Sequence, residues 1–243
     1  MSKKFPPQAR CYNCGKLIPD KDRTWEHIPM DALYKGFTEE DKRTRIQVCA
    51  CRSCNQQYSY IEQRLRNLIA VIGLLKKENN LSEIIGASMR SLKTDLEYKE
   101  QWTKLDDENY YFSINTKDYD DIHIKNLKGI IYNDLGFSLP DDEYKFVVMS
   151  DCGKECNGDD FDTMIIKSSR EFLRDRPNWK ESGNLNIFKY RLGVNWSFNY
   201  ELPIRVQDID IIICPMIYHN LVYAIVKAYK NEVYEKLSKS SFY

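Results

Sequence analysis

The sequence predicts an α+β protein in which a small metal-stapled module is followed by a helix-rich domain with a small antiparallel sheet. Three observations indicate this order. Two Cys-x-x-Cys pairs, Cys11/Cys14 and Cys51/Cys54, enclose a loop of 36 residues. Alternating apolar and polar residues, typical of a strand, come before the second pair, and apolar residues at helical spacing follow it. Farther along, helical patterns alternate with short strand-like runs, which favours a mixed fold.

The first module is expected to contain two strands followed by a long helix. Residues 25–28 form an extended run, because the proline that follows them disfavours helical backbone angles. Residues 45–49 alternate like a strand that enters the second cysteine pair. Between these runs, Thr38 is a suitable N-cap for a short acidic helix. From residue 55 to about residue 77, apolar side chains recur at spacings of three and four, which predicts a helix.

The rest of the chain predicts helices and short strands in mixed order. Helices are expected over residues 81–102, 122–135, 162–173 and 218–237. Strands are expected over residues 110–114, 145–150, 187–194, 196–204 and 209–214. Gly136 stands where a left-handed residue commonly ends a helix. We divide the chain into a module at residues 1–78 and an accessory α+β domain at residues 79–243.

The composition argues against a membrane or secreted protein. Of the 243 residues, 42% are apolar and 30% are charged. No apolar run approaches the roughly 20 residues that span a bilayer, and the N-terminus lacks the apolar stretch of a signal peptide. We therefore expect a cytoplasmic protein with no membrane partner. In a reducing compartment, cysteines in paired motifs indicate metal binding rather than disulfides.

The net charge of zero conceals an uneven distribution of charge along the chain. Residues 1–75 contain 13 Lys and Arg against 8 Asp and Glu. A basic segment is attracted to polyanions such as nucleic acid. Uneven solvated charge explains the same numbers equally well, so the choice between these interpretations depends on the motifs.

The four paired cysteines have the spacing of a tetrahedral zinc site. Zinc prefers four nitrogen or sulfur ligands, and two cysteines on one tight turn can face the same ion. Gly15, directly after the first pair, suits the sharp turn that such a pair needs. In the second pair Cys49 competes with Cys51, and we prefer Cys51 because it restores the two-residue spacing. We predict structural Zn²⁺ bound by Cys11, Cys14, Cys51 and Cys54.

The segment between and just after the cysteine pairs carries residues suited to hydrolysis. Glu26 and His27 are adjacent, and Asn55 directly follows the last cysteine. Carboxylate and amide oxygens are the ligands that Mg²⁺ prefers, and a histidine near its ordinary pKa can accept a proton from water. Neighbouring side chains on a strand point to opposite faces. One of the pair is therefore expected to hold a metal ion and the other to move a proton.

This combination resembles the HNH, or ββα-metal, nucleases, and in particular the zinc-stabilised four-cysteine members of the endonuclease VII type. The resemblance rests on Cys-x-x-Cys, Glu-His-Ile-Pro and Cys-x-x-Cys-Asn, and it covers residues 11 to about 70. It implies an N-terminal ββα-metal module with His27 as the general base. It also implies Glu26 and Asn55 as ligands of catalytic Mg²⁺ or Mn²⁺, beside the structural zinc. Many members have Asp in place of Glu26 and a second His in place of Asn55.

Three further residues are candidates for the same site. Glu62 lies two helical turns after Asn55 on the same face, so it is a third candidate ligand of the catalytic ion. A surface pair with Arg66 is the alternative role for Glu62. Arg52, inside the second cysteine pair, and Arg64 are candidates for phosphate contacts. Solvated helix charge explains Arg64 almost as well.

The motifs together predict a metal-dependent endonuclease that hydrolyses phosphodiester bonds in DNA. The leading alternative is a non-catalytic zinc module that binds nucleic acid or protein, which would need neither Glu26-His27 nor Asn55. RNA is a third possible substrate, since such a metal site contacts the phosphodiester and not the sugar. Residues 79–243 carry no comparable motif, and we expect them to provide specificity, regulation, or a contact for a homodimer or a partner protein. The family resemblance associates the chain with phage defence or restriction.

Overall fold

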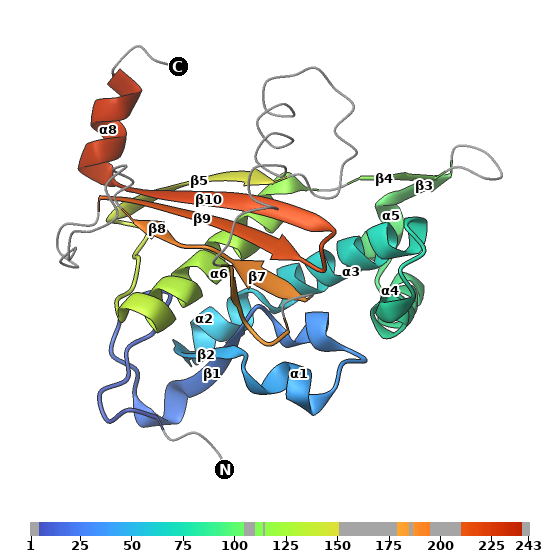
Figure 1. Ribbon diagram of the computed structural model, residues 1–243, viewed down its shortest axis with the longest axis horizontal. Helices are drawn as coiled ribbons and strands as arrows, with labels where there is room; N and C mark the ends of the chain where they lie inside the picture. The colour runs from blue at the N-terminus through green and yellow to red at the C-terminus, as the bar shows by residue number, and fades with distance from the viewer. Residues whose placement is uncertain are drawn as a thin grey trace.

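The structure has the mixed α+β architecture that the sequence predicts. The computed structural model describes residues 5–104, 110–113, 115–150, 179–184, 187–194 and 210–239. A two-stranded sheet near the N-terminus and a larger sheet near the C-terminus lie on opposite sides of a central group of helices (Figure 1). The candidate site residues belong to the first of these sheets, to the turn before it that carries Cys11 and Cys14, and to the helices that follow it.

The N-terminal hairpin pairs β1 (Arg23–Ile28) with β2 (Ile46–Cys51) in antiparallel register. Two helices follow directly, α2 (Arg52–Gln57) and α3 (Ser59–Leu75). The predicted order of two strands and a helix is therefore confirmed. The helix predicted over residues 55–77 begins earlier, at Arg52, and is divided at Tyr58 into α2 and α3.

The loop that joins the two strands carries η2 (Asp31–Tyr34) and α1 (Glu39–Arg43). Thr38 caps α1 as predicted. Its hydroxyl accepts a hydrogen bond from the Asp41 backbone N–H, and the Asp41 carboxylate accepts one from the Thr38 backbone N–H. This reciprocal pair satisfies donors that the first turn of a helix leaves open. A short helix, η1 (Asp20–Asp22), precedes β1.

Two helices, α4 (Ser82–Thr94) and α5 (Leu96–Glu100), replace the single helix predicted over residues 81–102. The break occurs at Asp95, whose carboxylate accepts a hydrogen bond of 3.1 Å from the Tyr98 backbone N–H. Asp95 thus starts a new helix as an N-cap. The remaining elements of this region are η3 (Asn79–Leu81), β3 (Trp102–Lys104) and β4 (Tyr110–Phe112).

The central helix is α6 (Thr116–Leu135), which lies between the two sheets in Figure 1. It begins before the predicted start at residue 122, because the Asn115 side chain caps it by accepting a hydrogen bond from the Lys117 backbone N–H. Gly136 ends the helix with a φ of 79°, as predicted. None of the helices in the described ranges is long and apolar enough to cross a bilayer.

The larger sheet has the strand order β5-β10-β9-β7-β6, and β8 pairs with β9. Every pairing in it is antiparallel, which confirms the predicted antiparallel sheet. The helix predicted at residues 162–173 and the strand at 196–204 lie outside the described residues. The strands are β5 (Tyr144–Ser150), β6 (Lys180–Glu181), β7 (Phe188–Tyr190), β8 (Gly193–Val194), β9 (Ile211–Tyr218) and β10 (Val222–Lys230).

The helix predicted over residues 218–237 is wrong in its first half. β9 and β10 form a hairpin there, and its turn residues His219 and Asn220 both have positive φ. Along β10, buried and half-buried side chains alternate, which is the period of a strand. The long apolar run conceals this alternation in the sequence, because both faces of the strand carry apolar residues. Only α8 (Asn231–Lys239) is helical.

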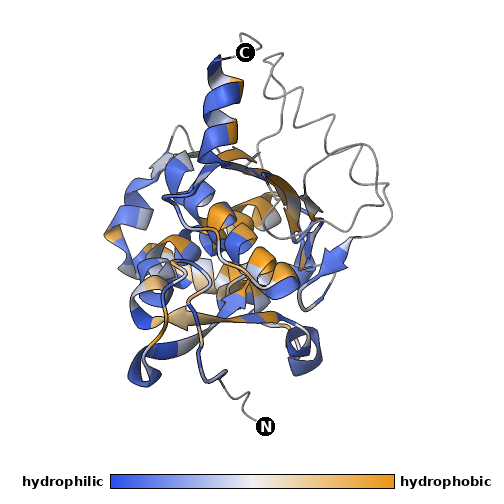
Figure 2. Ribbon diagram, turned by 90° about the vertical axis from the view of Figure 1, so that its left-hand side faces the viewer, coloured by the Kyte–Doolittle hydropathy of each residue, from blue (hydrophilic) through white to orange (hydrophobic). Residues whose placement is uncertain are grey.

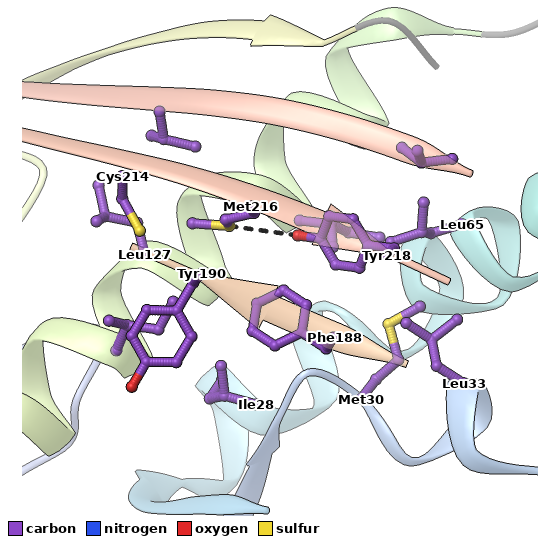
Figure 3. Close-up of a cluster of buried hydrophobic side chains, with 14 of the residues drawn as sticks. Ile28, Met30, Leu33, Leu65, Leu127, Phe188, Tyr190, Cys214, Met216 and Tyr218 are labelled. Carbon is purple, nitrogen blue, oxygen red and sulfur yellow. Dashed lines mark hydrogen bonds between the residues drawn. The ribbon is translucent and has the colours of Figure 1, made fainter. Parts of the chain in front are cut away.

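A single cluster of buried apolar side chains joins the two ends of the chain. Figure 2 shows the hydrophobic segments gathered at the centre of the molecule. In Figure 3, Ile28 and Leu33 from the N-terminal region lie near Phe188 and Tyr218 from the larger sheet. The boundary proposed between residues 78 and 79 stays a prediction, but the buried side chains on its two sides share this core.

Candidate metal centre and active site

The four predicted zinc ligands come together in the structure. The Sγ atoms of Cys11, Cys14, Cys51 and Cys54 all lie within 4.8 Å of one another. Cys51 belongs to this cluster and Cys49 does not, so the spacing argument selected the right residue. Four thiols are a donor set that suits tetrahedral zinc. The cluster is therefore able to bind zinc, and the ion would join the turn at residues 11–14 to residues 51–54.

The backbone around the first pair forms a tight turn. Gly15 has a φ of 68°, and its N–H donates a hydrogen bond of 2.9 Å to the Cys11 carbonyl. The Cys11 N–H in turn donates to the Lys16 carbonyl, also at 2.9 Å. Glycine adopts such a φ more readily than residues with a side chain. The second pair is presented differently, because β2 ends at Cys51 and the first turn of α2 carries Cys54.

The thiols are arranged so that one of them ionises readily. A hydrogen bond from the Cys54 thiol lowers the pKa of Cys11 below its usual value. Burial raises the pKa of Cys14. Thiolate is the form of cysteine that binds metal ions, so the cluster already favours charge at one ligand. A zinc ion would extend that preference to the others.

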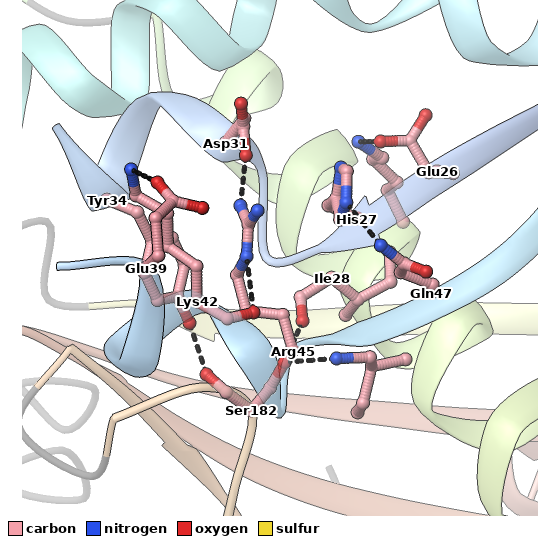
Figure 4. A network of polar contacts seen from close by, with 12 residues as sticks. Glu26, His27, Ile28, Asp31, Tyr34, Glu39, Lys42, Arg45, Gln47 and Ser182 are labelled. Carbon is pink, nitrogen blue, oxygen red and sulfur yellow. Dashed lines mark hydrogen bonds and ion pairs between the residues drawn. The ribbon is translucent and has the colours of Figure 1, made fainter. Parts of the chain in front are cut away.

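His27 lies on β1 opposite Gln47 on β2. Its Nε2 is 2.8 Å from the Gln47 side-chain nitrogen, and Figure 4 shows Gln47 reaching across the hairpin to the ring. Burial lowers the pKa of His27, and the positive charge of Arg45 lowers it further. The imidazole is therefore neutral at neutral pH. Neutral imidazole is the form that accepts a proton.

Arg45 is a neighbour of this site that sequence reasoning missed. Its guanidinium forms an ion pair with Asp31 and stands 4.7 Å over the Tyr34 ring. Figure 4 shows the Arg45–Asp31 pair between η2 and β2, near His27. The position of Arg45 just before a strand gave no signal for this role, since charged residues are common at such places.

Glu26 is buried, with 6% of its surface exposed, and it does not stand alone. Its Oε1 accepts a hydrogen bond of 2.9 Å from Lys125 Nζ on α6. Its Oε2 is buried and has no hydrogen-bond partner among the residues that the structure describes. Burial raises the pKa of this carboxyl, although the charge of Lys125 opposes that effect. Sequence reasoning missed Lys125, which lies 99 residues farther along the chain.

Glu62 meets the same ammonium group. Lys125 Nζ pairs with Glu62 Oε1 as well as with Glu26 Oε1, and it stands 5.6 Å from the centre of the Tyr58 ring. Lys125 itself is completely buried. The structure thus brings Glu26 and Glu62 together, as the prediction of a shared site requires. It places a lysine between them, in contrast to the alternative pair of Glu62 with Arg66.

Asn55 joins the second cysteine pair to β1. Its side-chain amide donates hydrogen bonds of 3.2 Å to the Trp25 carbonyl and to the Thr24 hydroxyl. Asn55 therefore lies against the strand directly before Glu26. These contacts place Asn55, which directly follows the last cysteine, beside the Glu26-His27 segment.

The two predicted phosphate-binding arginines have different surroundings. Arg52 is exposed, and its guanidinium donates a hydrogen bond of 3.3 Å to the Lys21 carbonyl. Arg64 is buried and forms ion pairs with Glu97 and, at 2.7 Å, with Asp118. Contacts inside the protein thus occupy the guanidinium of Arg64. We keep Arg52 as a candidate for phosphate contact. The phosphate contact predicted for Arg64 is wrong, because its ion pairs give this residue a structural role.

Glu26 and Asn55 carry oxygens of the kind that a divalent cation can use. Glu26 Oε2 is buried and has no hydrogen-bond partner in the part of the chain that the structure describes, and such an oxygen is normally satisfied. A carboxylate and an amide are donors that suit Mg²⁺ or Mn²⁺. Glu26 and Asn55 are the residues that could hold such an ion, and Glu62 contacts the Lys125 ammonium that also binds Glu26.

Comparisons with known proteins give no relative. No family model matches the chain, and no curated protein or solved structure matches it either. The functional argument therefore rests on the residues and their geometry.

Proposed function

We propose that the protein is a metal-dependent endonuclease of the HNH type that hydrolyses phosphodiester bonds in DNA. One observation carries the proposal. A neutral histidine, His27, stands next in the chain to Glu26, whose buried Oε2 lacks a partner. Asn55 ties this segment to the four-cysteine cluster. A plain zinc module has no need for this group of polar residues.

In the proposed reaction His27 accepts a proton from the attacking water molecule. The Gln47 side-chain N–H donates to Nε2, so the neutral ring carries its hydrogen on Nδ1 and Nε2 is the basic nitrogen. In the proposed reaction the attacking water takes the place of Gln47 at Nε2 and passes its proton there. The water oxygen forms a bond to phosphorus as the bond from phosphorus to the leaving oxygen breaks.

The divalent ion would neutralise charge on the phosphate and on the leaving oxygen. The chain's own contribution at that point is to hold the ligand oxygens. Glu26 is fixed through Oε1, and Asn55 is fixed against β1 through its amide nitrogen. Both contacts leave an oxygen of the same side chain for the ion.

The surroundings favour a polyanionic substrate. Residues 1–75 are basic overall, and Arg52 is exposed beside the cysteine cluster. Phosphate contacts of this kind position a nucleic acid and weaken as salt concentration rises. DNA is the substrate that the family resemblance favours, and RNA remains the competing outcome of the assay.

A cleavage assay tests the proposal. The zinc-loaded protein is incubated with single-stranded DNA, double-stranded DNA and RNA, with Mg²⁺, with Mn²⁺ and with neither. We expect cleavage of DNA that requires the divalent ion, and a loss of about 10²–10⁴-fold in His27→Ala. Zinc content and thermal unfolding of the variant show whether it is folded. Equal cleavage by His27→Ala and the parent at matched metal would refute the assignment.

The second candidate function is a non-catalytic zinc module that binds nucleic acid or protein. The pairing of Lys125 with both carboxylates favours it, because the protein's own cation already neutralises Glu26 and Glu62 in part. This alternative predicts DNA binding without turnover under every metal condition. It also predicts that His27→Ala binds as tightly as the parent.

A further inference from the structure

Lys125 is the unexpected member of the candidate site. Its ammonium group is completely buried and contacts one oxygen of Glu26 and one oxygen of Glu62. The lysine belongs to α6, outside the hairpin and outside the motif that predicts the nuclease. A buried ammonium is costly unless it is paired and hydrogen-bonded. The two carboxylates meet that requirement.

The approach of α6 to β1 explains how Lys125 reaches the site. A Cβ at Gly129 would lie only 2.4 Å from Ile28 Cγ1, so the helix comes this close because the residue is glycine. Lys125 lies one helical turn before Gly129, and Glu26 lies two strand positions before Ile28. Four residues of helix and two of strand both span about 6 Å. The two elements therefore match residue for residue, with Gly129 against Ile28 and Lys125 against Glu26.

The two carboxylate oxygens of Glu26 have different surroundings. Oε1 accepts a hydrogen bond from Lys125, whereas Oε2 is buried and has no partner within the described ranges of the chain. Glu62 is bound to the same ammonium through its Oε1. The two carboxylates share the one ammonium group, and the buried oxygen without a hydrogen-bond partner among the described residues is Oε2 of Glu26.

We propose that Lys125 is a positioning residue for the divalent-ion site and that its positive charge lowers the affinity of this site for the ion. Its ammonium fixes Glu26 through Oε1, leaves Oε2 as the ligand atom, and binds Glu62 as its anchor. This inference rests on the proposed function, since it concerns the ion of the same site. Glu62, which the sequence predicted as a metal ligand, then contacts Lys125 and not the ion.

One consequence distinguishes this role from a purely structural one. The positive charge of Lys125 repels the divalent ion, so removal of that charge tightens binding. At the effective dielectric of a protein site, a unit charge at such short range changes affinity by on the order of tenfold or more. A lysine that served only to fill space would leave the affinity unchanged.

Calorimetric titration of the zinc-loaded full-length protein with Mn²⁺ tests the inference. We expect one ion per chain in the parent, at least about tenfold tighter binding in Lys125→Met, and loss of binding in Glu26→Gln. Zinc content measured before and after each titration shows whether Mn²⁺ exchanges into the cysteine site. Unchanged or weaker binding in Lys125→Met overturns the inference.

The double variant Glu62→Gln/Lys125→Met provides the charge-matched control. It removes one negative and one positive charge, so the charge around Glu26 equals that of the parent. It also leaves no unpaired ammonium, and replacement of a whole buried pair is often tolerated. If Glu62 only anchors Lys125, the double variant binds Mn²⁺ within about tenfold of the parent. Loss of binding in the double variant makes Glu62 a ligand and overturns the inference.

The cleavage assay separates failure of this inference from failure of the proposed function. A parent that binds Mn²⁺ with the expected variant pattern but cuts no nucleic acid supports the Lys125 role and refutes the nuclease. A parent that cuts DNA while Lys125→Met binds no more tightly supports the nuclease and refutes the Lys125 role. If the parent and Lys125→Met both bind no Mn²⁺, both proposals fail.

Discussion

Two charged clusters share the N-terminal hairpin, and they are completed in different ways. The four thiols all come from residues 11–54, within the motif itself. The carboxylate cluster begins on the same hairpin with Glu26 but receives its cation, Lys125, from a helix 99 residues farther along the chain. The clusters meet at Cys54 and Asn55, which are consecutive residues on α2.

The difference has a physical consequence for folding. Four converging sulfurs gain little from one another without an ion, because thiolates repel and thiols bond weakly. The carboxylates have an ammonium group of the chain's own to neutralise them. We therefore expect the thiol cluster to need its metal for stability and the carboxylate cluster to be formed without one.

The largest expected effect is that of zinc removal. Structural zinc contributes folding free energy on the order of 10 kcal/mol in small modules, so a strong chelator or Cys11→Ser should unfold the hairpin region. Thermal unfolding followed by circular dichroism, with zinc measured by mass spectrometry, checks this. Cys214→Ala, a buried thiol outside the cluster, is the control and should keep its zinc. An unchanged melting temperature after zinc loss would show that the clusters do not differ in this way.

The next effect in size is that of Lys125→Met in the absence of divalent ions. Removing one partner of a buried ion pair leaves an uncompensated charge and typically costs about 3–5 kcal/mol. We expect a loss of that order in urea unfolding, with Mn²⁺ restoring part of it. The double variant Glu62→Gln/Lys125→Met should lose clearly less. Equal losses in the two variants would mean that packing, and not charge, accounts for the effect.

Acid should destabilise the protein through its histidines as well as its thiolates. Burial lowers the pKa of His219 to about 4 and that of His123 to about 3. Between pH 6.5 and those values the unfolded chain binds protons that the folded chain does not, so stability falls as pH falls. For His219 the loss by pH 5 is about 2 kcal/mol. Urea unfolding at several pH values measures it.

His219→Asn separates the histidine share of this acid effect from the thiolate share. Asparagine tolerates the positive φ at this position and does not titrate. The variant should therefore show a shallower dependence of stability on pH than the parent at the same zinc content. Parallel curves for the two proteins would assign the acid effect to the thiols and to the other titrating groups.

The smallest expected effect concerns the surface beside the two clusters. Arg52→Ala should weaken DNA binding by less than about 1.4 kcal/mol and reduce its salt dependence by about one phosphate contact. Fluorescence anisotropy at several salt concentrations measures both quantities. Arg43→Ala, an exposed arginine that pairs with Glu40, is the matched control and should leave the salt dependence unchanged. Equal effects of the two substitutions would indicate a diffuse basic surface without a specific contact at Arg52.

The sequence by itself determined the features that depend on neighbouring residues. Thr38 caps α1, Gly136 ends α6, and the runs at Trp25–Ile28 and Ile46–Cys49 are strands, because each of these signals acts within a few residues. The four thiols also follow from spacing, since a turn at Gly15 and the first turn of α2 set their geometry locally.

Only the tertiary structure decided which partners the charged side chains take. Arg64 and Lys125 look in the sequence like solvated helix residues, yet both are buried among acids that come from distant segments. The β9–β10 hairpin likewise depends on packing, because an apolar run suits either a helix or a strand until its faces are covered. Which charged side chains pair and which become buried depends on which elements pack together. The close approach of α6 to β1 at Gly129 joins residues 101 positions apart, so no pattern of neighbouring residues predicts it.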